Sequence, residues 1–379
     1  MGAPWSRVVN STIKKYIRER EINILRNRKL TALLKKKDRI SFNWSGISMD
    51  WKVKYKRVRL TPYADGDTLE FSRKDRNKTA GLDWRGYSAT DSMTKGEFLM
   101  NRNTEAIIKL YSEISSDLID DMEDAFGEEA YINGYAVGNS KRVHGIESFF
   151  NGATNTGANI GNGNAQPTAT YAGLSTVPGA YGGQWDSGTL PAWPNGRGDA
   201  QFDFWSPLAV DYGDILFSGN TSGVVNANST WANNCVEAIS YGIIKTKKSK
   251  SAKGQLDLIL TDDEMYRQYV KVMRQKERIL VERSADKSPL IALGFSDVIN
   301  QDGTDVTWEY GIPYGTGYGL NCDMMEIRSQ QAQLFVPEGP DQDIASKSWR
   351  FSVDFFGNFV FNPKFFLKLW NYTNSSDAV

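Results

Sequence analysis

The side chains that most often perform catalysis are scarce in this 379-residue chain. Its only histidine is His144, so a Ser-His-Asp or Cys-His catalyst would have to use that residue, and no serine or cysteine can be paired with it from the sequence. A lone histidine that precedes a glycine is more often structural than catalytic. We therefore expect His144 to be a structural residue.

Metal, nucleotide and acid–base sites have equally little support. Cys235 and Cys322 lie far apart and outside any C-x-x-C or Cys/His spacing. Gly161-Asn162-Gly163 lacks the strand-to-helix frame and the following lysine of a phosphate cradle. Carboxylates are abundant, so a glycosidase-like pair stays possible, but no single acid stands out. We expect no enzymatic activity, no metal and no cofactor.

Composition narrows the protein class further. Lys plus Arg and Asp plus Glu number 45 each, so no global field attracts nucleic acid or a membrane. No run of eighteen apolar residues occurs, and the first forty residues contain no apolar signal-peptide core. Hydrophobic residues make up 40% of the chain and aromatic residues 12%, which is typical of a folded, β-rich protein of two or three lobes. Because the two cysteines give no disulfide framework, we expect the protein to assemble in a reduced intracellular environment.

The first basic segment runs from Trp5 to Ile40, with a helical pattern and 12 Lys or Arg against three acids. Such a run is typical of a solvated helix face, and equally of an arm that contacts phosphate groups or a neighbouring molecule. Both interpretations stay open. The candidate contact residues are Lys14, Lys15, Arg18, Lys35, Lys36 and Lys37.

The second basic segment alternates like a β-strand after Trp51. A phase slip near Arg57 indicates a bulge, Asp65-Gly66 supplies turn chemistry, and Leu69 and Phe71 alternate again on the return. An isolated hairpin is marginal in water, so we expect this one to need a partner surface. The cations of its outer face are Lys52, Lys54, Lys56, Arg57 and Arg59.

A long amphipathic helix is predicted next. Thr94 and Glu97 have capping-box spacing, and apolar residues recur every three or four positions up to Phe126. An unbroken helix from Lys95 would be about 48 Å long at ~1.5 Å per residue. Its last turns are acidic although the macrodipole favours cations there, so we expect a basic partner from the arm or the hairpin, supplied by this chain or a neighbouring copy. The acidic residues concerned are Asp117, Asp120, Asp121 and Asp124.

The remainder of the chain mixes helices and strands. Residues 151–198 are rich in Gly, Asn and Thr, and their aromatic residues indicate ordered loops anchored to a core more than a sugar-binding platform. A helix at 231–244, a strand at 256–260 and a helix at 264–276, capped by Asp262 or Asp263, predict an α+β lobe. Near the C-terminus, alternating aromatics on both sides of Gly357-Asn358 predict a hairpin with a two-residue turn.

Several short stretches carry a resemblance to coat sequences of tailed bacteriophages. They are Trp84-Arg85-Gly86-Tyr87, Val143-His144-Gly145-Ile146-Glu147-Ser148, and Asn362-Pro363-Lys364 with Trp370-Asn371-Tyr372. Together with the order of parts, the chain resembles the Hong Kong 97-like capsid fold over most of its length. The resemblance implies an α+β fold with a basic N-terminal arm (1–46), an E-loop hairpin and its return (47–92), a peripheral domain with a spine helix (93–152), an axial domain with a Gly-rich insertion (153–283), and strands returning to the peripheral domain (284–379).

The function implied by the resemblance is that of a major capsid protein. Hexamers and pentamers of the chain would form an icosahedral virion shell around double-stranded DNA, assembled in the host cytoplasm without a membrane, with E-loops lapping neighbouring subunits. About forty-six residues precede the E-loop, fewer than a fused scaffolding segment needs, so a separate scaffolding protein is expected, with portal and decoration proteins as further partners. No covalent crosslink is assigned.

Two other functions stay open. A carbohydrate-binding tail or fibre protein would use the exposed aromatics Tyr181, Trp185 and Trp193, and a β-rich glycan hydrolase would use paired acids.

Overall fold

The structure is a computed structural model of the 379-residue chain. It describes residues 28–55, 62–69, 71, 73, 76–100, 104–150, 170–176, 205, 207–213, 230–247, 255–276, 290, 295, 297–343 and 345–371. The described helices are α2 (Lys29–Lys36), α3 (Lys95–Met100), α4 (Thr104–Glu129), α6 (Trp231–Thr246) and α7 (Asp263–Lys276), with short 3-10 turns η1 (Ile146–Phe149), η5 (Cys322–Met324) and η6 (Pro363–Phe365). None of these helices has the length and apolarity that crossing a bilayer demands.

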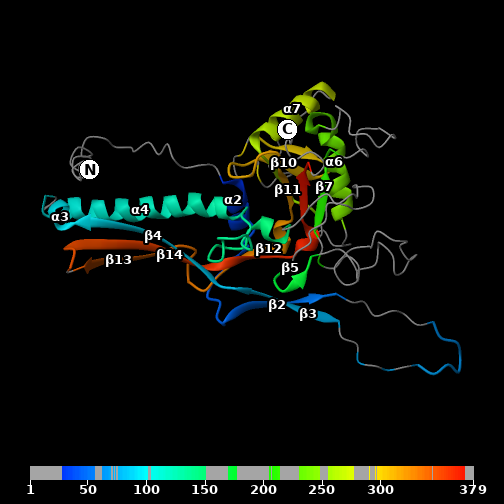
Figure 1. Cartoon of the computed structure of the whole chain (residues 1–379), viewed down its shortest axis with the longest axis horizontal. Helices are drawn as coiled ribbons and strands as arrows, with labels where there is room; N and C mark the ends of the chain where they lie inside the picture. The colour runs from blue at the N-terminus through cyan, green and yellow to red at the C-terminus, as the bar shows by residue number, and fades with distance from the viewer. Residues whose placement is uncertain are drawn as a thin grey trace.

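The molecule is elongated, with α4 and a five-stranded sheet lying along its long axis (Figure 1). In this first sheet β14 is the common strand, since it pairs antiparallel with three of the others. Phe126 of α4 packs on this sheet, with its ring 4.6 Å from Phe355 and 5.1 Å from Phe359. The strands are β1 (Ile40–Ser41), β4 (Arg85–Thr94), β12 (Met325–Ser329), β13 (Val336–Asp343) and β14 (Ser348–Phe361).

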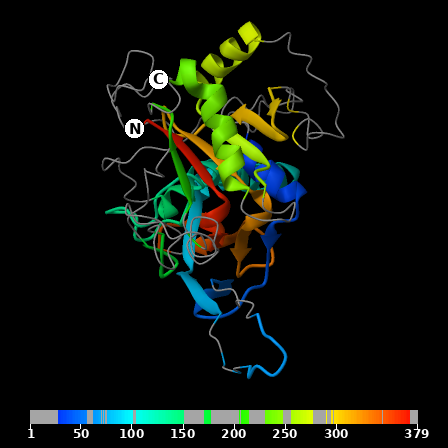
Figure 2. The same cartoon turned by 90° about the vertical axis from the view of Figure 1, so that its right-hand side faces the viewer.

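A six-stranded sheet forms a second lobe at one end of the long axis (Figures 1 and 2). Helix α6 packs on β7 and β15, α7 packs on β10, and the two helices pack on each other. Trp231, Ile239 and Tyr269 are fully buried between helices and sheet. The strand order is β7 (Leu208–Asp211), β15 (Leu367–Trp370), β11 (Gly317–Leu320), β8 (Leu258–Thr261), β10 (Thr304–Trp308) and β9 (Ile299–Gln301).

A two-stranded hairpin of β2 (Ser48–Lys54) and β3 (Asn77–Asp83) leaves the body below the second lobe (Figure 1). A small ribbon, β5 (Thr170–Tyr171) with β6 (Leu174–Ser175), contacts the hairpin root, where Gly81 N donates to Ala172 O at 3.1 Å. Tyr171 and Trp205 are fully buried, which confirms core anchoring for these two aromatics of the glycine-rich region and its border. Tyr181, Trp185 and Trp193 lie outside the described residues.

Several local predictions are confirmed. Thr94 and Glu97 form the capping box, with Thr94 N donating to Glu97 Oε2 at 2.9 Å and Glu97 N donating to Thr94 Oγ1 at 3.4 Å. Asp262 caps α7, since its Oδ1 accepts from Met265 N at 2.6 Å. The predicted long helix is described as α3 and α4, with residues 101–103 between them outside the description.

The predicted hairpin turn at Gly357-Asn358 is wrong, because β14 runs straight through both residues. Two-residue hairpin turns need positive φ, and neither residue has it. The Asn358 side chain instead hydrogen-bonds two backbone groups: its Oδ1 accepts from His144 N at 2.9 Å, and its Nδ2 donates to Asp83 O at 3.0 Å.

The predicted return strand at Leu69 and Phe71 is also wrong. Both residues lie outside any strand and are exposed, and the strand that pairs with β2 begins at Asn77. The bulge predicted near Arg57 lies outside the described residues.

We call α4 and the five-stranded sheet the first lobe. The expected return of the strands of residues 284–379 to the domain with the long helix holds for only part of this range. Only β12, β13 and β14 from this range join the first sheet, whereas β9, β10, β11 and β15 complete the second. Each short strand alone carries no signal for which sheet it joins.

Candidate inter-subunit surfaces

The root of the hairpin is built into the core of its own chain. On one face of the ribbon Met49 and Val53 of β2 and Leu82 of β3 are buried, because strand side chains alternate between faces. On the other face Lys52 and Lys54 are exposed, as the alternation predicted, and no described acid forms an ion pair with either. Lys56, Arg57 and Arg59 lie outside the described residues.

An aromatic clamp holds the hairpin root in place. The guanidinium of Arg328 on β12 lies 4.3 Å from the Trp44 ring and 5.9 Å from the Trp51 ring. Trp51 packs on Trp205 at 6.3 Å, and Trp84 Nε1 donates to Gly46 O at 3.0 Å. These contacts set the direction in which the hairpin leaves the body.

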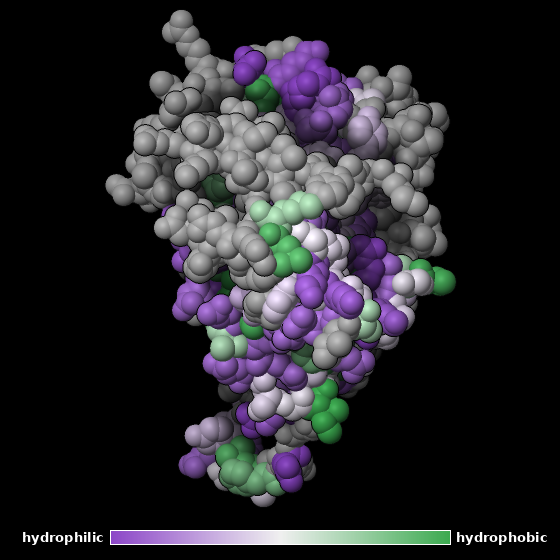
Figure 3. Space-filling model, turned by 90° about the vertical axis from the view of Figure 1, so that its left-hand side faces the viewer, coloured by the Kyte–Doolittle hydropathy of each residue, from purple (hydrophilic) through white to green (hydrophobic). Residues whose placement is uncertain are grey.

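The tip of the hairpin exposes large apolar side chains. Phe71 is 95% exposed, Tyr63 71% and Leu69 44%. A turn at Asp65-Gly66, with Gly66 at φ +94° and Ala64 N donating to Asp67 Oδ2 at 2.7 Å, separates Tyr63 from the other two. Figure 3 shows hydrophobic side chains gathered at the lower end of the molecule, the end where Figure 2 places the hairpin. Exposed apolar clusters of this kind mark contact surfaces.

A groove of about 750 Å³ at the opposite end of the long axis is acidic. Arg350 is its only described cation and pairs with Asp343. Hydrogen bonds from Ser346 Oγ and Ala345 N, helped by Arg350, lower the pKa of the Asp343 carboxyl. The groove lies between β4 and β13, across the start of β14, and its acids are Asp91, Glu338, Asp341 and Asp343.

Some of the acids at the C-terminal end of α4 form ion pairs with cations of the same chain. Arg28 pairs with Asp124 at 2.9 Å and with Glu128 at 3.3 Å, and Lys35 pairs with Glu123. Of the two sources expected for the partner of Asp124, the structure shows the one within this chain, the buried Arg28 of its own arm. Asp117 and Asp120 are half-buried and Asp121 is exposed. Asp120 and Asp121 are therefore the two acids that we consider for contact with a neighbour.

The cations at the end of the basic arm are also engaged internally. Lys37 pairs with Asp257 at 2.9 Å, and Lys35 is the partner of Glu123. Lys36 lies between them at the end of α2. This part of the arm packs on its own chain, which limits its use as a phosphate contact. Lys14, Lys15 and Arg18 lie outside the described residues.

His144 has the environment of a structural residue. It is 3% exposed, and burial, reinforced by the nearby Arg85, lowers the pKa of its imidazole to about 4. The ring lies 4.4 Å from the Tyr135 ring and fills the space beside Gly134, where a Cβ would meet Nδ1 at 2.5 Å. Within the described part of the chain no cluster of three His, Cys, Asp or Glu is arranged to hold a metal.

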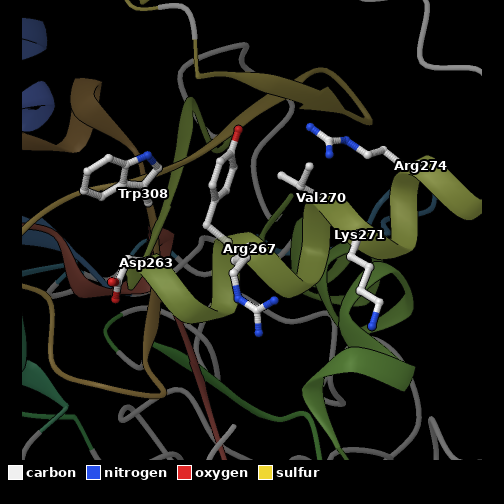
Figure 4. A pocket seen from close by; sticks show the side chains of 7 residues that line it. Asp263, Arg267, Val270, Lys271, Arg274 and Trp308 are labelled. Atoms are coloured by element: carbon white, nitrogen blue, oxygen red, sulfur yellow. The ribbon is translucent and has the colours of Figure 1, made fainter.

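A second groove, of about 600 Å³, follows α7 (Figure 4). Arg267, Lys271 and Arg274 are spread along it, with Trp308 near the start of the helix. Asp263 and Glu264 in the first turn and cations toward the C-terminus follow the helix macrodipole, and Arg267 is paired with Glu264. A solvated helix face explains this groove.

Sequence reasoning missed both the acidic groove and the Arg328 clamp. The groove's acids come from two strands that lie more than two hundred residues apart in the chain, so the sequence does not show that they meet. The only local sign of an acidic strand face is the spacing of Asp341 and Asp343, two residues apart. Arg328 carries no signal at all, because its two tryptophans are distant in sequence.

Comparisons with known proteins identify the fold. No family model and no curated protein matches the sequence. A solved cyanophage A-1(L) capsid subunit is similar over 93% of this chain and 95% of its own, with TM-score 0.54 and 16% identity. A cyanophage P-SCSP1u capsid subunit is similar over 94% and 93%, with TM-score 0.51 and 10% identity. The chain therefore has the mixed α/β fold of phage capsid subunits.

Proposed function

We propose that this chain, which has the fold of phage capsid subunits, is the major capsid protein of a tailed bacteriophage. Its copies form the hexamers and pentamers of an icosahedral head that encloses double-stranded DNA. The observation that carries the proposal is the fold likeness over nearly the whole of both chains. A projecting hairpin with an apolar tip, which its own chain leaves uncovered, supports it.

The Hong Kong 97-like parts are assigned on the same basis. In this proposal residues 1–46 are the N-terminal arm, the β2–β3 ribbon is the E-loop, α4 is the spine helix, and the first sheet belongs to the peripheral domain. The six-stranded sheet with α6 and α7 corresponds to the axial domain.

The mechanism we propose is contact of one copy's hairpin with the acidic groove of another. The hairpin presents Lys52 and Lys54, and the groove presents four carboxylates against one arginine. The two surfaces lie at opposite ends of one molecule, so a hairpin is far from its own groove (Figure 1). A contact between two different surfaces is heterologous, and it closes into rings when the rotation between copies permits.

Electron microscopy of the full chain tests the function. Expressed with a separate scaffolding protein, the chain should form shells or capsomers. A strictly monomeric protein that binds or cleaves glycans would instead support the tail-fibre or hydrolase alternatives. The proposal also includes scaffolding, portal and decoration proteins as partners. It places the chain in the virion, in non-specific contact with packaged DNA.

Charge reversal tests the proposed contact. Lys52→Glu with Lys54→Glu should abolish shells, and adding Asp91→Lys with Asp341→Lys should restore them by reversing both partners. Lys271→Glu on the exposed face of α7 is the matched control and should assemble normally. Normal shells from the hairpin variant would refute this contact without refuting the capsid function.

The acids left at the end of α4 are tested separately. Asp120→Lys with Asp121→Lys should impair assembly if a neighbour's cations bind there. Asp124 is left unchanged because its replacement would remove the nearer of the two carboxylates that pair with the buried Arg28. Unaltered particles would remove Asp120 and Asp121 from the interface.

A further inference from the structure

The last part of the basic arm, residues 28–39, crosses from α4 to the second lobe. We call these residues the strap. Arg28 joins the two lobes: its Nε donates to Asp124 Oδ1 on α4 at 3.0 Å, and its Nη1 donates to Tyr310 O, just after β10, at 2.5 Å. Leu30, Leu33 and Leu34 are fully buried, in a core that also holds residues of α4 and of β8 and β11 in the second lobe.

The far end of the strap is tied to the second lobe and to the 3-10 turn that leads into the first sheet. Lys37 pairs with Asp257, just before β8, at 2.9 Å, and Arg39 pairs with Asp323 in η5 at 2.8 Å. The strap is therefore held by charges at both ends and by leucines in the middle.

Lys29 is buried in the second lobe. It is 3% exposed, and its Nζ donates to Thr307 Oγ1 at 2.7 Å and to Trp308 O at 2.8 Å, 5.0 Å from the Trp308 ring. Burial lowers the pKa of the Lys29 ammonium group, against the attraction of Asp297 and Glu309.

Glu309 lies under the strap and is 2% exposed. Its Oε2 accepts a hydrogen bond from Leu30 N at 2.8 Å, so the carboxyl group touches the strap backbone directly. Tyr131, 3% exposed, faces it from the segment after α4, and Arg28 and Lys29 face it from the strap. Burial raises the pKa of Glu309 to about 7, despite the Leu30 hydrogen bond and the two cations.

We propose that residues 28–39 are a releasable strap that holds the second lobe against α4, and that loss of the proton from the Glu309 carboxyl group loosens it. The neutral acid suits a buried site, whereas the carboxylate is poorly solvated there and gains when the strap opens to water. The inference concerns the single subunit and stands independently of shell assembly.

The direction of the pH effect follows from the two states of Glu309. With its pKa at about 7 under the closed strap and near its ordinary 4.5 when exposed, Glu309 favours closure fully below 4.5. This contribution is lost as pH rises from 4.5 to 7, which increases the opening equilibrium roughly a hundredfold. Lys29 acts in the opposite direction, since its lowered pKa makes closure more favourable as pH rises toward 10.5.

Other ionisable groups near the site do not produce this change. The pKa of Tyr131 is raised well above its ordinary value, mainly by burial, so its hydroxyl stays protonated throughout this range. Asp124 and Glu128 act on Arg28 through ion pairs, and Asp297 acts on Lys29. The variant Glu309→Gln, which keeps the shape and a carbonyl acceptor for Leu30 N, isolates the Glu309 contribution.

Hydrogen exchange on the full chain tests the proposal. The reporters are the amides of Lys37 and Arg39, which donate to Leu33 O at 2.9 Å and Leu34 O at 3.0 Å. Between about pH 5 and about pH 8, after correction for intrinsic exchange, their protection should fall roughly a hundredfold in the natural chain and stay constant in Glu309→Gln. The matched control Glu237→Gln, at an exposed glutamate of α6, should behave like the natural chain.

Lys29→Met provides a second, independent reading. Without the neighbouring cation the Glu309 carboxyl holds its proton to higher pH, so the midpoint of the protection loss should move upward. An equal fall in protection in Glu309→Gln, no fall in the natural chain, or an unmoved midpoint in Lys29→Met would each overturn the proposal.

Discussion

The strap and the hairpin are both basic segments of the first hundred residues, but the first two cations of the strap are buried and those of β2 in the hairpin are exposed. Arg28 is buried in an ion pair and Lys29 is buried and hydrogen-bonded, whereas Lys52 and Lys54 are exposed, with no ion pair to a described acid. What separates them is the surroundings: the strap lies between lobes that present carboxylates, and the hairpin leaves the body. A run of like charge thus does not by itself say whether it meets solvent, a neighbour or its own core.

The largest effect on the isolated subunit is expected from Arg28→Ala. Removing the guanidinium leaves Asp124 and the Tyr310 carbonyl without their partner in a largely buried place, so the free energy of unfolding should fall by about 3–5 kcal/mol. Denaturant unfolding measures it. A loss below about 1 kcal/mol would mean that the strap contributes no more to the free energy of unfolding than the exposed hairpin does.

The next largest difference between the strap and the hairpin is expected when an apolar side chain in each is shortened to alanine. Leu34 is fully buried and Phe71 is 95% exposed, so Leu34→Ala should cost about 2–5 kcal/mol of unfolding free energy and Phe71→Ala less than about 0.5 kcal/mol. Calorimetry of the two subunit variants compares them directly. Equal losses would mean that the hairpin tip folds back on its own chain in solution.

A smaller effect is expected at the helix start that follows the hairpin. Thr94→Ala removes the Oγ1 acceptor of Glu97 N, so the unfolding free energy should fall by about 1 kcal/mol. Ser92→Ala, two residues earlier on exposed β4, is the control for denaturant unfolding. A similar loss in both variants would show that the capping box contributes nothing beyond strand packing.

The smallest effect on the subunit is expected from Lys52→Gln with Lys54→Gln. Exposed cations without ion pairs contribute little, so the unfolding free energy should change by less than about 0.5 kcal/mol. Shell yield, measured by sedimentation, should nevertheless fall and lose part of its sensitivity to salt. Destabilisation of the subunit without a change in yield would assign these lysines to the fold.

Where the signal is local, the sequence predicted the fold well. The capping box at Thr94 and Glu97 and the alternation of β2 depend on nearby residues, and both are confirmed. Gly357-Asn358 failed because the buried amide of Asn358 satisfies His144 N and Asp83 O, groups distant in sequence. Leu69 and Phe71 failed because an apolar alternation at an exposed tip is indistinguishable from a strand.

The candidate surfaces were less accessible to sequence reasoning. The exposed lysines of β2 followed from alternation alone, but the partner of Asp124 lies 96 residues away in the chain. The acidic groove exists only because β4 and β13 meet on β14. Surfaces assembled from distant strands require the topology.

The length of β14 has a mechanical consequence. Ten of its residues, Ser348 to Gly357, pair with β4, and β4 continues directly from the hairpin through Trp84. A pull on the hairpin is therefore directed along β4 and strains these pairings side by side in shear, so that they resist together instead of opening one after another. The hairpin is thus connected through β4 to β14, the longest strand of the first sheet, and only Trp84 lies between β3 and β4. Tension along β3 therefore reaches the body without passing through a loop.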